Sequence, residues 1–156
     1  MRGFFDLLAI HELGHAYHSQ GGLTMQRKWM GELFANIFLH TYIAEKQPNS
    51  LPALTVFPKM VVSSTNKEEL KYTTLDELES NYNIISQQYP NNYGWYQCRW
   101  HMAAGNIYDD GGIQTFQNLW QILKNQQDPL DDLAFASLLS SKVAQSIADV
   151  QIKWNE

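Results

Sequence analysis

The stretch FDLLAIHELGHAYHSQGG, which runs from Phe5 to Gly22, gives the clearest helical signal in the chain. Its apolar residues and histidines recur every three or four positions, as they do on one face of an α-helix. We therefore predict a helix over residues 3–20. Gly21 and Gly22 follow it, and glycine directly after a helix is a typical C-terminal cap. The predicted face consists of Phe4, Leu7, Leu8, His11, His15 and His18.

The composition is that of an ordinary globular domain. The 156 residues are 44% hydrophobic and 17% charged, and they suffice for one domain with its own core. The net charge is −5 and no basic patch is present, which argues against nucleic-acid binding. No apolar run is long enough to span a membrane. Cys98 is the single cysteine, so an intramolecular disulfide is excluded, and no segment of the chain indicates a cellular compartment.

The rest of the chain is also expected to be mainly helical. Thr74 and Glu77 form a capping-box pattern at a helix start. Apolar periodicity and end signals predict helices over 31–46, 74–88, 95–108, about 116–123 and 129–154, with a turn at 90–94 and a stop at Gly111-Gly112. Residues 47–73 contain three prolines and predict either a loop with a short helix or a small β-hairpin. The expected fold class is mainly α, with a small β element possible only in 47–73.

The pentapeptide HELGH, His11 to His15, has the spacing of a metal site. Two histidines four residues apart leave a helix on the same side, about 6 Å apart along its axis, so both imidazoles can reach one Zn²⁺ ion. Glu12 lies beside the ion, where its carboxylate can take a proton from water and pass it to a leaving group. Gly14 weakens a helix by about 1 kcal/mol relative to alanine, which indicates that another element packs closely against this turn.

A zinc site of this kind needs a third protein ligand, and the sequence offers His18, Glu32 and His40. His18 lies about 10 Å from His11 along the same helix, so His18 cannot converge with the other two histidines on one ion. We expect it to support a ligand or to be a polar face residue. Glu32 follows the Gly-Gly turn, which can bring its carboxylate back toward the first helix. Glu32 is therefore a candidate for the third ligand, with a residue that stabilises a helix N-terminus as the alternative, and we place His40 in the core or behind a ligand.

HELGH together with GELFAN, Gly31 to Asn36, resembles the gluzincins, the clan of zinc metallopeptidases that includes thermolysin and aminopeptidase N. In that clan a second helix supplies a glutamate ligand, which the aminopeptidase branch carries in an NEGFA-like segment. Glu32, Phe34 and Ala35 match this segment, whereas Gly31 and Leu33 differ, and the resemblance therefore implies Glu32 as the third zinc ligand. In the thermolysin branch an aspartate four residues after this glutamate orients the first histidine. Asn36 takes that place here and can accept the same hydrogen bond without the charge.

A second segment, NYGWYQCRWHMAAGNIYDDGG, Asn92 to Gly112, is similar to an aminopeptidase-type helix that begins with an active-site tyrosine and ends at a Gly-Gly turn. The resemblance places Tyr96 on that tyrosine, whose hydroxyl donates to the oxyanion formed when water attacks the carbonyl. Tyr93 and His101 are the alternatives for this role. The resemblance covers residues 5–40 and 92–123.

The resemblance implies a zinc-dependent hydrolase whose substrate is a peptide or a small amide. Gluzincins build their cleft from a helical lobe and an upstream β-rich lobe, and ten residues before His11 cannot contain the latter. We expect residues 1–156 to be one helical catalytic domain without that lobe. Its exposed apolar surface would favour self-association or packing against such a lobe. The alternatives are a non-catalytic metal-binding or interaction domain and an HExxH enzyme that acts on a small molecule.

Overall fold

The structure, a computed structural model, describes residues 2–156, with side chains from residue 3 onward. Within these residues the chain forms seven α-helices, two short 3-10 helices and no β-strand, which confirms the mainly α prediction. The elements in order are α1 (Arg2–Gln20), α2 (Lys28–Lys46), η1 (Pro48–Ser50), α3 (Leu51–Ser64), η2 (Lys67–Glu69), α4 (Leu75–Gln88), α5 (Pro90–Asn125), α6 (Asp132–Lys142) and α7 (Gln145–Ile152).

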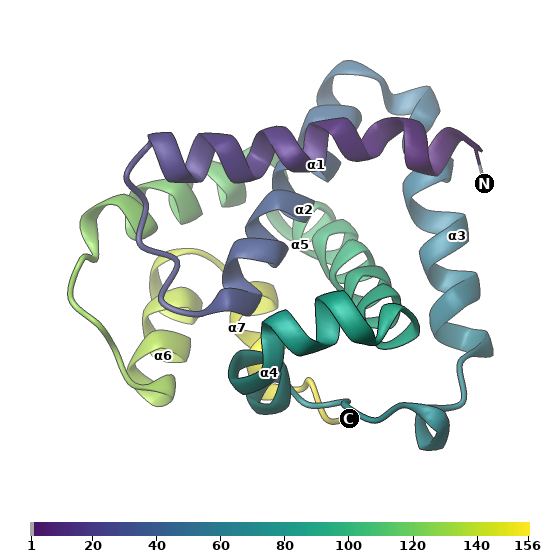
Figure 1. The fold of residues 1–156 in the computed structure, drawn as a ribbon. Helices are drawn as coiled ribbons and strands as arrows, with labels where there is room; N and C mark the ends of the chain where they lie inside the picture. Colours follow the sequence, from purple (N-terminus) through teal and green to yellow (C-terminus); the bar gives the residue numbers. More distant parts are fainter. Residues whose placement is uncertain (1) are drawn as a thin grey trace.

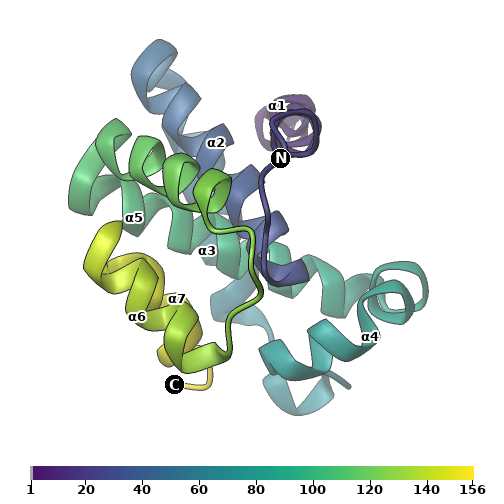
Figure 2. The same ribbon diagram turned by 90° about the vertical axis from the view of Figure 1, so that its left-hand side faces the viewer.

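Helix α2 is the centre of the arrangement, and thirteen of its nineteen residues are buried. It packs against α1 on one side and against α5 on another. Figure 1 shows α1 crossing the top of the molecule, with α2 and α5 beneath it and α3 along the side. In Figure 2, where α1 is seen end-on, α6 and α7 lie on the opposite side of α5 from α1. Helix α1 is therefore an outer helix supported mainly from one side.

Two predicted helix ends are confirmed: the glycine cap at the end of α1 and the capping box at the start of α4. At the end of α1, the Leu23 amide donates to the His18 carbonyl at 3.1 Å and the Gly22 amide to the Ser19 carbonyl at 3.2 Å. Gly22 has a φ of +63°, so these bonds form the Schellman motif that glycine favours. At the start of α4, the Thr74 hydroxyl accepts from the Glu77 amide at 3.2 Å, and the Glu77 carboxylate accepts from the Thr74 amide at 3.0 Å.

The alternative of a small β element in residues 47–73 is wrong, because most of this segment is helical. Pro48 and Pro52 each stand at the start of a helix, where the missing N–H removes no hydrogen bond. Pro58 lies inside α3 and costs one helical bond, but its ring is buried together with Leu54. Leu51, Leu54, Phe57 and Val61 recur every three or four positions along α3 and are buried or half-buried, which stabilises the helix despite its prolines.

One expectation about α5 is also wrong, and another is confirmed. Residues 90–94 were expected to form a turn, but Pro90 opens α5 instead, in the first-turn position that suits proline. The Gly111-Gly112 pair is expected to end a helix, and it does, since Gly112 adopts the non-helical angles φ +58° and ψ −151°. The helices expected over 95–108 and about 116–123 are therefore both present, one on each side of this break within α5.

The single helix expected over residues 129–154 is two helices. Asp131 caps α6 through a hydrogen bond from the Ala134 amide to its side chain at 2.8 Å, so Pro129 precedes the helix. Between α6 and α7, Ala144 is fully extended, with φ −165° and ψ 150°. The break lets both helices turn apolar residues inward, Phe135 and Leu139 from α6 and Ile147 from α7. Burial of these side chains outweighs the helical bonds that are lost at the break.

The outward face of α1 exposes apolar side chains, as expected from the sequence. Leu13 and Tyr17 are each 45% exposed, whereas Phe5, which is 55% exposed, lies on the side of α1 that faces α3. What covers this face stays a prediction. Among the described residues, no helix combines the length and the apolar character that crossing a membrane requires.

Candidate metal centre

His11, His15 and Glu32 come together at the crossing of α1 and α2. The Nε2 atoms of His11 and His15 lie 3.1 Å apart. Oε2 of Glu32 lies 3.4 Å from the first and 3.5 Å from the second. In the described part of the chain these three residues are the one group of histidine, cysteine or acidic side chains close enough to share an ion. All three ligands expected from the sequence are therefore brought to one point.

The spacing of these three atoms fits a tetrahedral zinc site. Ligand atoms that each lie about 2.0–2.1 Å from a zinc ion are about 3.3 Å from one another in a tetrahedron. The three measured separations, 3.1, 3.4 and 3.5 Å, are close to this value. The donor set, two imidazoles and one carboxylate, is also one that zinc accepts, and it leaves a fourth position open, as in catalytic sites.

Gly14 lets the two helices approach closely enough to form this cluster. A Cβ atom at Gly14 would lie 3.0 Å from Cα and 3.3 Å from Cβ of Ala35. The expectation that an element packs against this turn is confirmed, and the element is α2. Because Gly14 neighbours His15 and Ala35 lies one turn beyond Glu32, the contact sets the distance between ligands on the two helices.

Replacing Gly14 with alanine is expected to force α1 away from α2. Overpacking against backbone atoms costs about 1–3 kcal/mol, which exceeds the gain of about 1 kcal/mol in helix propensity. We expect the melting temperature to fall by a few degrees, about 2–4 °C per kcal/mol lost. Gly94→Ala is the control, because no atom beyond its own stretch of helix lies within 4 Å of its Cβ position. Equal melting temperatures for the two variants would contradict the claim that close packing of α1 on α2 requires glycine at position 14.

Glu32 is held from the far side by Tyr82 of α4 and by Tyr93 and Gln97 of α5. The hydroxyls of Tyr82 and Tyr93 donate to Oε1, the latter at 3.3 Å, and the Gln97 amide donates to Oε2 at 2.6 Å. Burial raises the pKa of Glu32, but hydrogen bonds from the two histidines, Tyr82 and Gln97 together outweigh it and hold the pKa well below its usual range. The carboxylate is therefore ionised at neutral pH, which a metal ligand requires.

The two tyrosines remain donors at neutral pH. Burial, followed by the nearby Glu32 charge, raises the pKa of Tyr93 to about 12, and the same causes raise the pKa of Tyr82 further. Both hydroxyls therefore keep their protons and fix the orientation of the carboxylate. Tyr93 was among the residues expected near the site. Tyr82 and Gln97 were not expected, because they are 50 and 65 residues from Glu32 and match no local motif.

His18 supports His15 and does not join the ligand cluster. Nε2 of His18 lies 3.2 Å from Nδ1 of His15. Burial, together with the nearby His15, lowers the pKa of His18 and favours its neutral ring, which can accept a hydrogen bond from Nδ1–H of His15. That hydrogen bond leaves Nε2 of His15 free to face Glu32. His40, the other residue considered as a third ligand, is buried against Tyr108 and Gly105, away from the cluster.

Asn36 contacts Glu32 rather than His11. Its Nδ2 donates to the main-chain carbonyl of Glu32 at 3.0 Å and to Oε1 of Gln97 at 3.2 Å. Within residues 2–156, neither Nδ1 of His11 nor Oδ1 of Asn36 has a hydrogen-bond partner, although both atoms are buried. Asn36 thus orients the Gln97 side chain that holds Glu32, which differs from the role that the resemblance implied.

Tyr96 is not placed at the cluster. Its hydroxyl donates to the Thr74 carbonyl at 2.7 Å, and its ring stacks on Trp154 at 5.7 Å and on Trp100 at 5.7 Å. It is fully buried in this aromatic core. The helical phase of α5 explains the difference, since Tyr93 and Gln97 share the face that meets Glu32, whereas Tyr96 and Trp100 share the face that meets α7 and the C-terminal segment.

Removing the Tyr96 hydroxyl is therefore expected to affect stability and not zinc binding. Tyr96→Phe deletes one buried hydrogen bond, which is worth about 0.5–1.5 kcal/mol. We expect thermal unfolding a few degrees lower, with zinc affinity and any hydrolytic rate constant unchanged. A Tyr96→Phe protein with normal stability and a reduced catalytic rate would instead place this hydroxyl at the reacting carbonyl.

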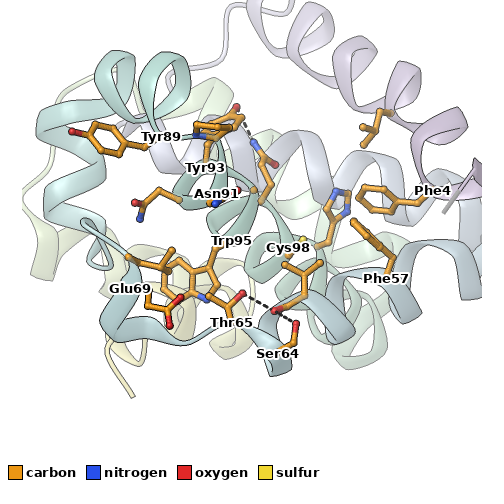
Figure 3. A pocket seen from close by; sticks show the side chains of 18 of the residues that line it. Phe4, Phe57, Ser64, Thr65, Glu69, Tyr89, Asn91, Tyr93, Trp95 and Cys98 are labelled. Carbon is orange, nitrogen blue, oxygen red and sulfur yellow. Dashed lines mark hydrogen bonds between the residues drawn. The ribbon is translucent and has the colours of Figure 1, made fainter.

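Glu12 and His101 face a cavity that adjoins the cluster. The cavity lies between α1, α3 and α5 and is also lined by His11, Tyr93 and Gln97 (Figure 3). Glu12 is exposed and forms no hydrogen bond with another described residue, so its carboxylate is available to a molecule in the cavity. Burial, then the neighbouring His11 and His40, lowers the pKa of His101 to about 3, so its ring is neutral at pH 7.

Comparison with known proteins adds no relative. The chain matches no protein-family model, no curated protein and no solved structure. The arguments for this site therefore rest on the chemistry of its residues and on their geometry.

Proposed function

We propose that this protein is a zinc-dependent hydrolase that acts on peptide or amide bonds. The observation that carries the proposal is the geometry of His11, His15 and Glu32, whose three ligand atoms are spaced as the corners of a zinc tetrahedron. Zinc bound there would supply Lewis-acid activation of water and polarise the carbonyl of the substrate.

The other roles fall to side chains that face the cavity. Glu12 takes a proton from the attacking water and returns it to the leaving nitrogen, because its carboxylate is exposed beside His11 and has no competing partner among the described residues. His101 offers a neutral hydrogen-bond donor for the carbonyl oxygen, whereas the single hydroxyl proton of Tyr93 is donated to Glu32. Tyr82, Gln97 and Asn36 hold Glu32 in place, and His18 holds His15.

The proposal is tested by assaying the purified protein against a defined mixture of peptides, with products identified by mass spectrometry. Three samples are compared: protein loaded with one equivalent of zinc, protein stripped with a chelator, and stripped protein with zinc restored. We expect cleavage in the first and third samples only. Cleavage that is equal in all three, or that is absent from the zinc-loaded protein for every peptide and amide tested, contradicts the proposal.

A second candidate is a metal-binding or interaction domain without catalysis. The hydrogen bonds that Tyr82, Tyr93 and Gln97 donate to Glu32 favour it, because they satisfy this buried carboxylate without any ion. The same experiment separates the two candidates. Zinc bound by His11, His15 and Glu32 with no cleavage of any substrate supports the second candidate.

A further inference from the structure

The cavity beside the candidate metal centre is large enough to hold part of a substrate. Its volume is about 890 Å³, within the range of ligand-binding pockets. His11 and Glu12 belong to its wall, so the cavity begins where the proposed reaction takes place. Its remaining walls come from α3, from residues 65–71 after it, from the end of α4 and from the first three turns of α5 (Figure 3).

The two ends of the cavity differ in character. At one end the rings of Phe4 and Phe57 are 4.8 Å apart, and Phe5 lies 5.8 Å from Phe57. Figure 3 shows Phe4 and Phe57 at this end and Glu69, Tyr89 and Asn91 at the other. The polar end is lined by Asn66, Glu69, Lys71, Gln88 and Asn91. A ligand that fills the whole cavity therefore needs an apolar group on one side and polar groups on the other.

The aromatic end is continuous with the metal centre through His101. The ring of His101 lies 4.9 Å from that of Phe4 and 6.4 Å from that of His11. Phe4 precedes His11 by seven residues, which is about 10 Å along α1. One large side chain and the backbone that carries it can span this distance from a carbonyl held beside His11.

We propose that this cavity binds the substrate and that its aromatic end, formed by Phe4, Phe5 and Phe57, selects a large aromatic side chain next to the amide that is cleaved. The proposal rests on the proposed hydrolase function, which it extends by naming the substrate class. Edge-to-face contacts with the three rings favour another flat ring over an aliphatic side chain of similar size.

Helix α3 supplies the part of this end that can be altered without touching the metal ligands. Phe57 and Val61 line the cavity, whereas Val56 on the same helix is 66% exposed and does not line it. Residues 51–64 also lie outside the two segments that resemble gluzincins, so the selection would be a property of this chain. Val56 is a matched control for changes at Phe57.

The test compares two zinc-binding probes, phenylalanine hydroxamate and alanine hydroxamate, by titration calorimetry on the zinc-loaded protein. Burial of a phenyl ring predicts that the phenylalanine compound binds at least about 30-fold more tightly. We expect Phe57→Ala to reduce this preference to a few-fold and Val56→Ala to leave it unchanged. Val61→Trp fills the cavity and is expected to abolish the preference while binding of alanine hydroxamate persists. If Phe57→Ala does not fold, the result for Val61→Trp tests the selection of the aromatic side chain.

A parallel comparison without a metal-binding group separates this inference from the proposed function. N-acetylphenylalaninamide and N-acetylalaninamide are titrated into zinc-free protein and followed by NMR. Tighter binding of the aromatic amide that is lost in Val61→Trp supports the proposed cavity, whether or not the protein binds zinc. A protein that binds no zinc contradicts only the proposed function. Equal binding of the aromatic and small compounds in both experiments overturns the inference, whatever the metal content.

Discussion

Replacing Glu12 with glutamine is expected to reduce hydrolysis by about two to four orders of magnitude, the usual contribution of a general acid–base group. Glutamine matches glutamate in shape but cannot accept a proton from water at neutral pH. The side chain is exposed and hydrogen bonds to no other described residue, so the fold should not change. Zinc content should also be unchanged, because the carboxylate of Glu12 is not one of the three clustered ligand atoms.

The matched control for this variant is Asp6→Asn. Asp6 lies on the same helix, is exposed and does not line the cavity. It therefore tests whether loss of one negative charge on α1 is enough to lower the rate. Rates, zinc content and melting temperature are measured for both variants. A Glu12→Gln protein that hydrolyses the substrate as fast as wild type would remove Glu12 from the mechanism.

Replacing Glu32 with alanine is expected to lower zinc affinity by at least about 100-fold. Loss of a residue that merely orients a ligand costs about 10–100-fold, and Glu32 is itself one of three ligands. The variant also leaves Tyr82, Tyr93 and Gln97 without their acceptor in a buried site, where each unpaired donor costs about 1–3 kcal/mol. We therefore expect lower stability as well as weaker zinc binding.

Two further variants separate these effects. Glu32→Gln keeps an acceptor for the neighbouring donors but removes the charge, so it should retain more stability than Glu32→Ala while still losing most zinc affinity. Tyr82→Phe removes one orienting hydrogen bond and should weaken zinc binding by about 10–100-fold. Zinc affinity is measured by competition with a chromophoric chelator. Unchanged affinity in both Glu32 variants would exclude Glu32 as a ligand.

The grouping of His11, His15 and Glu32 could be predicted from the sequence, because the spacing of the two histidines is local and the resemblance to gluzincins implied the glutamate. His11 and His15 are four residues apart on a helix that ends at a glycine cap, and Glu32 follows on the next helix. Helix geometry alone then limits which side chains can share an ion. The close approach at Gly14 could be inferred for the same reason, since an unfavourable residue inside a helix indicates a packing demand.

The partners of Glu32 could not be predicted, because they depend on how distant helices meet. Tyr82 reaches Oε1 from α4 and Gln97 reaches Oε2 from α5, and no sequence signal links either residue to residue 32. Tyr96 shows how sensitive such predictions are to helical phase. It is one residue from Gln97, yet its hydroxyl bonds to the Thr74 carbonyl in a different part of the molecule.

The errors in the fold prediction have a common physical cause. Pro58 carries a strong local signal against a helix, and tertiary packing overrides it. The break between α6 and α7 is the reverse case, a helix end without a local signal, since the sequence around Val143 and Ala144 contains neither glycine nor proline. Burial of side chains from both helices decides where the chain turns, and that is not visible from local preference.

The most direct test of the metal centre is a crystal structure of the zinc-loaded protein with diffraction data collected on both sides of the zinc absorption edge. The account predicts one strong anomalous peak per chain, about 2.0–2.2 Å from Nε2 of His11, Nε2 of His15 and Oε2 of Glu32. No peak between these three atoms, or a zinc ion bound elsewhere with the cluster unchanged, would contradict it.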